Sequence, residues 1–134
     1  MPRLFLRLVF VLFTTGFVSL IVVADRGGAG HLWDFVGKLP CGDKLGHLVL
    51  VGTLSLLLNL LLEGRRAPGH RPRLLPGSAF LLVVMLLEEG SQAFIPHRSC
   101  DPLDGLANVI GILCGEGLVR MLPCSVRESA ARGG

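Results

Sequence analysis

Side chains that could bind a ligand or move a proton occur in three short motifs of an otherwise apolar chain. The motifs are DKLGH at residues 43–47, EEGSQ at 88–92 and RSCDPLDGLAN at 98–108. Their candidate ligand-binding residues are Asp43, Lys44, His47, Glu89, Gln92, Arg98, Asp104 and Asn108. A histidine beside carboxylates can act as a general base or a nucleophile, so the candidate catalytic residues are His47, Glu89 and Asp104.

The elements that position these residues are predicted to be membrane-spanning helices. Of the 134 residues, 51% are hydrophobic and only 17% are charged, which is too apolar for an ordinary soluble domain. A helix needs about 20 apolar residues to cross a bilayer. Four segments approach that length: 4–24, 45–62, 74–95 and 103–122. We therefore expect an all-α polytopic membrane protein, one domain over 1–134 with a bundle of four transmembrane helices and a disordered tail at 125–134.

The first segment and the basic residues bear on topology. Residues 4–24 could be a cleaved secretory signal, but their length and the apolar sequence after them favour a retained helix. With four spans, eight arginines fall on one side of the membrane, namely Arg3, Arg7, Arg65, Arg66, Arg71, Arg73, Arg127 and Arg132. The other side has four basic residues, Arg26, Lys38, Lys44 and Arg98. Because cytoplasmic loops are enriched in Lys and Arg, both termini are predicted to be cytoplasmic and the three motifs to lie at the outer side.

The polar residues of the three motifs are predicted to share one depth. Asp43 and His47 are four residues apart, as are Asp104 and Asn108, so each pair lies on one helix face. Counted from the outer helix ends, the polar side chains fall within about 10 Å of the boundary. A shared outer pocket is one interpretation, and helix-to-helix hydrogen bonding at about 0.6–2 kcal/mol per pair is the other. Of the two adjacent glutamates, Glu89 is expected to face the pocket because it shares a face with Gln92.

Other residues have structural interpretations. Ala107, Gly111 and Gly115 form a small-xxx-small pattern for close helix packing, and Glu116 can pair with Arg120 one turn later. Asp101 before Pro102 is typical of a helix N-cap, and Arg98 could pair with Asp101 or Asp104 instead of a ligand.

The cysteines and the charge pattern argue against several classes of protein. The cysteines at 41, 100, 114 and 124 have no metal-binding spacing, so no metal and no cofactor are predicted, although a site built from His47, Glu89 and Asp104 is conceivable. Cys41 and Cys100 would lie on the outer side and could form a disulfide. The net charge is only +3 and no basic patch stands out, so nucleic-acid binding is not expected.

The three motifs together resemble the VanZ-like family of small membrane proteins. The resemblance rests on DKxxH at Asp43, Lys44 and His47, on ExxQ at Glu89 and Gln92, and on R-x5-D-x3-N-x2-G from Arg98 through Asp104 and Asn108 to Gly111. It covers residues 43–115. It implies a multi-helix protein of the bacterial plasma membrane with a cell-envelope role, in a family named for an accessory protein associated with teicoplanin resistance, and it implies no established reaction.

Three functions remain open at this point. Lys44, His47 and Arg98 could bind an anionic membrane lipid, a peptidoglycan precursor or a glycopeptide antibiotic. Alternatively, an enzyme acting on a lipid-linked or phosphate-containing substrate would use His47 as base or nucleophile, with Glu89 or Asp104 orienting it. A helical scaffold held by its polar layer is the third possibility, and the oligomeric state is left open.

Overall fold

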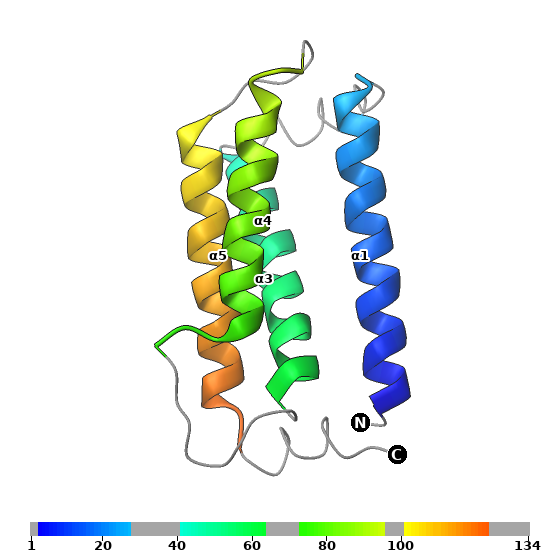
Figure 1. Cartoon of the computed structure of the whole chain (residues 1–134), viewed down its shortest axis with the longest axis vertical. Helices are drawn as coiled ribbons and strands as arrows, with labels where there is room; N and C mark the ends of the chain where they lie inside the picture. Colours follow the sequence, from blue (N-terminus) through cyan, green and yellow to red (C-terminus); the bar gives the residue numbers. More distant parts are fainter. Residues whose placement is uncertain (1–2, 28–40, 64–72, 96–100, 124–134) are drawn as a thin grey trace.

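The described part of the chain is entirely helical. A computed structural model describes residues 3–27, 41–63, 73–95 and 101–123. Its helices are α1 (Arg3–Asp25), α3 (Gly42–Glu63), α4 (Pro76–Gln92) and α5 (Pro102–Met121). They stand side by side along one axis (Figure 1). The all-α prediction is confirmed, while the predicted tail at 125–134 lies outside the described residues.

Three of the four helices are long and apolar enough to cross a membrane, namely α1, α3 from Gly42 to Leu62, and α5. Helix α4 has 17 residues. At about 1.5 Å per residue it is about 26 Å long, slightly less than the roughly 30 Å of a bilayer core. The predicted third span, 74–95, is longer than this helix because a proline limits each end. Leu75 is extended before Pro76, and Ile95 precedes Pro96, where a helical conformation is disfavoured.

Helices α3 and α5 form the tightest pair of the bundle. A Cβ atom added at Gly111 would lie 2.5 Å from the backbone oxygen of Leu48, and one added at Gly115 would meet the backbone oxygen of Gly52. Glycine is therefore required at both positions, and the two backbones touch without intervening side chains. The predicted role of the small-xxx-small pattern in packing is confirmed for Gly111 and Gly115.

The two paired helices run in the same direction. Hydrogen bonds between them join residues 57 to 61 positions apart, a nearly constant offset that only parallel neighbours produce. Helices α1 and α4 run the opposite way (Figure 1). The starts of α3 and α5 thus meet at one end of the bundle, together with the end of α4.

The apolar core lies among α3, α4 and α5. Its buried residues are Val51, Leu54, Leu81, Met85 and Ile112, and phenylalanines of α1 pack against it. Helix α1 buries little else, because most of its large apolar side chains are exposed, including Leu4, Leu8 and Leu12. Such an apolar outer surface suits contact with lipid rather than with water.

Candidate functional site: a polar cluster where α3 and α5 begin

Nine polar residues gather where α3 and α5 begin and α4 ends. We call this group the His47 cluster; its members are Asp43, Lys44, His47, Glu88, Glu89, Gln92, Asp101, Asp104 and Asn108. The parallel pairing of α3 and α5 brings the DKLGH motif alongside DGLAN, and the antiparallel α4 brings its last turns to the same level. The structure therefore brings together seven of the eight candidate residues, while Arg98 lies outside the described residues.

Lys44 connects α3 to the start of α5. Its Nζ atom donates to Asp101 Oδ2 at 2.9 Å and to Asp104 Oδ1 at 3.1 Å. The Lys44 and Asp101 side chains are about one-third exposed, whereas that of Asp104 is only 9% exposed. The Lys44 ammonium is thus already paired with two carboxylates, so only part of its positive charge is available to a ligand.

Asp101 has two roles, of which the sequence indicated one. Its side chain caps α5 by accepting the Leu103 backbone N–H at 2.9 Å, which confirms the predicted N-cap. It also accepts the hydrogen bond from Lys44. That ammonium, together with the Leu103 N–H, holds the pKa of Asp101 below its ordinary value of 3.8. Asp101 belongs to the site as well, although it was predicted only as a cap or as a partner of Arg98.

His47 is held by α5 through one ring nitrogen. Its Nδ1 atom lies 3.1 Å from Asn108 Oδ1, and because an amide oxygen can only accept, Nδ1 carries the proton. The other nitrogen, Nε2, lies 3.9 Å from Asp43 Oδ1 and 4.0 Å from Asp104 Oδ2. These separations are too long for hydrogen bonds. Nε2 therefore faces two carboxylates without a hydrogen bond to either.

Glu89 is the buried glutamate of α4, as predicted. It is 6% exposed, and its Oε1 atom accepts the Asp101 backbone N–H at 3.0 Å. Its Oε2 atom is buried and has no hydrogen-bond partner among the described residues. The carboxylate lies within electrostatic reach of both Asp104 and His47. Glu89 thus brings to the cluster an acceptor atom that the described residues leave unused.

Gln92 also faces inward, at 2% exposed, and its hydrogen-bond partner lies on its own helix. Its Nε2 atom donates to Glu88 Oε1 at 3.0 Å, one turn earlier on α4. Glu88 therefore positions Gln92, a role that the sequence interpretation did not assign to it. The i, i+4 spacing of these two residues was the available signal.

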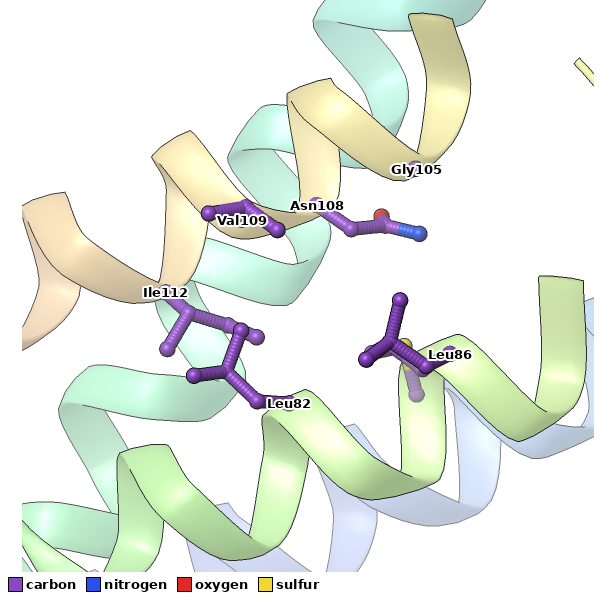
Figure 2. Close-up of a pocket in the computed structure, with 7 residues that line it drawn as sticks. Leu82, Leu86, Gly105, Asn108, Val109 and Ile112 are labelled. Atoms are coloured by element: carbon purple, nitrogen blue, oxygen red, sulfur yellow. The ribbon is translucent and has the colours of Figure 1, made fainter. Parts of the chain in front are cut away.

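An apolar crevice between α4 and α5 continues from the cluster toward the middle of the bundle. It is too narrow to admit a water molecule in this structure and is lined by Leu82, Met85, Leu86, Gly105, Asn108, Val109 and Ile112. Figure 2 shows the Asn108 amide reaching from α5 toward α4 at one end of this lining. The Asn108 Nδ2 atom is buried and has no partner among the described residues. Asn108 is therefore shared by the cluster and the crevice.

Three side chains of the cluster could together hold a metal ion. One ligand atom each from Asp43, His47 and Asp104 lies within 4.8 Å of the other two. This set contains Asp43 in place of Glu89, which was the third member of the set considered from the sequence. The i, i+4 pair on α3 supplies two of the three atoms.

The predicted disulfide stays a prediction. Cys41 is exposed and carries a free thiol, and Cys100 lies outside the described residues.

A second polar group lies toward the other end of the bundle, where α4 begins. We call it the Asn59 cluster; its members are Ser55, Asn59, Ser78, Glu116 and Arg120. Asn59 Nδ2 donates to Ser78 at 2.9 Å, and Ser55 donates to the Ile112 backbone oxygen at 2.9 Å. Glu116 accepts the Leu75 backbone N–H at 3.0 Å and the Arg120 Nε–H at 2.8 Å. The predicted Glu116–Arg120 pair is confirmed, and it also fixes the start of α4.

The His47 cluster offers a ring nitrogen at His47 Nε2, hydrogen-bond acceptors at its carboxylates and one donor at Asn108 Nδ2. Comparison of the chain with protein-family models, with curated proteins and with solved structures found no match.

Proposed function

We propose that this chain is a VanZ-like protein of the bacterial plasma membrane that binds the polar head of an amphiphile at the His47 cluster. The ligand is an anionic lipid, a peptidoglycan precursor or a glycopeptide, and its apolar part enters the narrow crevice between α4 and α5 as these two helices move apart. Both termini are cytoplasmic in this proposal, because the arginine-rich segments carry more of the basic residues than the opposite side.

The observation that carries this proposal is the continuity of the polar cluster with the apolar crevice through Asn108. A ligand pocket combines apolar walls with a few polar groups that fix orientation. Here the Asn108 Nδ2 donor, which has no partner among the described residues, lies where the two regions meet. A carbonyl or phosphate oxygen at the junction of head and tail would accept its hydrogen bond.

The test is ligand binding by the purified protein in detergent, followed as a thermal shift. Phosphatidylglycerol, a lipid-linked peptidoglycan precursor and teicoplanin are compared with an uncharged detergent-like lipid. We expect one of the first three to stabilise the protein. Stabilisation by none of them, or equally by the uncharged lipid, would contradict the proposal.

Two tryptophan variants on adjacent positions of α4 sharpen this test. Leu86→Trp adds bulk to the lining of the crevice, and Leu87→Trp adds the same bulk at a similarly exposed position that does not line it. We expect the first to weaken binding at least about tenfold, equivalent to about 1.4 kcal/mol, and the second to leave it unchanged. Equal effects of the two variants would remove the crevice from the proposal.

A second candidate function is hydrolysis or transfer on a lipid-linked phosphate substrate. The observation that favours it is the position of His47 Nε2, which lies 3.9 and 4.0 Å from two carboxylates without a hydrogen bond to either. Such a nitrogen can accept a proton from water or a hydroxyl group. Product formation by the purified protein, lost in His47→Gln, would support an enzyme; binding without product would support the first candidate.

A further inference from the structure

We propose that Asp43, His47 and Asp104 form a binding site for one divalent transition-metal ion. Zinc and similar ions bind nitrogen and oxygen ligands at about 2.1 Å, so two ligands of one ion lie about 3–4 Å apart. The separations from His47 Nε2 to the two carboxylate oxygens are 3.9 and 4.0 Å. These distances are too long for hydrogen bonds and close to those of atoms that share an ion.

The histidine is oriented as a metal ligand must be. A ligating histidine usually donates its other ring N–H to an acceptor, which fixes the tautomer and the ring plane. In this chain Asn108 Oδ1 accepts from Nδ1, and Nε2 faces Asp43 and Asp104. Imidazole nitrogen favours Zn²⁺ and related ions over Ca²⁺ or Mg²⁺.

Asp104 has one oxygen bonded to Lys44 and the other available to the proposed ion. Oδ1 accepts from Lys44 at 3.1 Å, while Oδ2 is the oxygen nearest to His47 Nε2. The Asp43 and Asp104 carboxylates also repel each other. Five acids of the cluster face one fixed cation, Lys44, among the described residues: Asp43, Glu88, Glu89, Asp101 and Asp104. A bound divalent cation would offset this excess of negative charge.

Glu89 supplies an independent indication of a ligand. Its Oε2 atom is buried without a hydrogen-bond partner among the described residues, in a carboxylate that interacts with both Asp104 and His47. A buried carboxylate oxygen normally has a donor. Water bound to a metal ion at the three ligands would be a strong hydrogen-bond donor within the same cluster.

A bound metal ion would also explain how a cluster rich in acids can hold an anionic head group. This step rests on the proposed function. An anionic head group would be repelled by the acidic cluster, whereas three protein ligands leave coordination positions open for its phosphate or carboxylate oxygens. The ion would then bridge the protein and the head group.

Metal binding is tested first, without any lipid. The full-length protein is purified in detergent, stripped with EDTA and titrated with Co²⁺, whose visible absorption reports its coordination, and then with Zn²⁺ as competitor. We expect one Co²⁺ per chain, displaced by Zn²⁺. Asp43→Asn and His47→Gln should each weaken binding more than about 100-fold, and Asn108→Ala by about 10–100-fold as the loss of an outer partner.

Two further variants separate the three-residue site from its alternatives. Cys41→Ser removes the exposed thiol two residues before Asp43 and should leave Co²⁺ binding unchanged. Lys44→Gln removes the ammonium that competes for Asp104 and should tighten Co²⁺ binding severalfold. Asp43 is half exposed, so its variant tests the site even if His47→Gln fails to fold.

The proposal is overturned if Co²⁺ does not bind at micromolar to millimolar concentration, or if Asp43→Asn binds it as tightly as the natural chain. Lipid binding is then measured with and without EDTA. Head-group binding that persists in EDTA leaves the proposed function standing and rejects the bridging ion. Metal binding without any lipid binding keeps the metal site and rejects the proposed function.

Discussion

The two polar clusters of the bundle differ in how completely their hydrogen-bonding groups are paired. In the Asn59 cluster, Ser55, Asn59 and Ser78 are no more than 1% exposed and bond with one another, and one atom, Asn59 Oδ1, has no partner among the described residues. In the His47 cluster, Asp43 is half exposed, a Glu89 oxygen and the Asn108 Nδ2 have no partner among the described residues, and His47 Nε2 faces two carboxylates beyond hydrogen-bond distance. The first arrangement joins helices, and the second leaves groups available to a ligand.

This contrast separates two uses of buried polar residues in the same small bundle. A fully paired polar group stabilises helix contacts, and removing one partner leaves the other buried and unpaired. A group kept without a partner contributes little stability and is typical of a binding site. The following substitutions test the contrast, beginning with the largest expected effect.

The largest loss of stability is expected from Glu116→Gln in the Asn59 cluster. It removes the charge that pairs with Arg120 and disturbs the acceptor of the Leu75 N–H, so the free energy of unfolding should fall by about 2–4 kcal/mol. Denaturation of the purified protein in mixed detergent micelles measures this. Metal and lipid binding by the folded fraction should be unchanged, and weakened binding there would mean that the clusters are not separate in role.

A smaller loss is expected from Gly111→Ala, which acts on both clusters through the α3/α5 contact. The added Cβ would lie 2.5 Å from the Leu48 backbone oxygen, so the helices must separate, at a cost of about 1–3 kcal/mol. Gly117→Ala is the control, because nothing lies within 4 Å of its added Cβ. It should not destabilise the protein. A similar loss for both variants would show that backbone contact does not join α3 to α5.

Little or no loss is expected from Glu89→Gln, the matched substitution in the His47 cluster. Glutamine keeps an acceptor for the Asp101 N–H and removes repulsion from Glu88 and Asp104. The free energy of unfolding should therefore stay within about 0.5 kcal/mol of the natural value or rise above it. The same denaturation experiment applies. A loss as large as that of Glu116→Gln would place Glu89 among the structural residues.

The smallest effect is expected when the pH is lowered and the ion pair between Lys44 and Asp101 loses its contribution to stability. Because the folded-state pKa of Asp101 is lowered, its contribution to stability is complete above the ordinary pKa of 3.8 and is lost as the pH falls through the lowered pKa. Asp101→Asn keeps an N-cap side chain but cannot titrate. The thermal midpoint of the natural chain should fall slightly more between pH 5 and pH 3 than that of the variant. An equal fall of the thermal midpoint in the natural chain and in the variant would show that this pair adds nothing to stability.

Sequence periodicity was sufficient for the helices and for the residues that share a helix face. Asp43 with His47 and Asp104 with Asn108 follow from the i, i+4 rule, and the choice of Glu89 over Glu88 follows from its face. Contacts between helices could not be derived this way. Three contacts depend on which helices are neighbours and in which register: the Lys44–Asp101 pair, the bond from the α4 N-cap N–H to Glu116, and the Asn59–Ser78 bond. Apolar content does not encode that register.

The glycine contact between α3 and α5 also determines which part of the His47 cluster can move. Two helices in backbone contact cannot rotate independently, so Lys44, His47, Asp104 and Asn108 keep one fixed geometry. Helix α4 is held by Glu116 at its start, while near its end Glu89 bonds the Asp101 N–H. We therefore expect any opening of the site to move α4 away from the α3–α5 pair and to break the bond between Glu89 and the Asp101 N–H. Distance measurements between spin labels would find the α3–α5 separation constant while the α4–α5 separation changes.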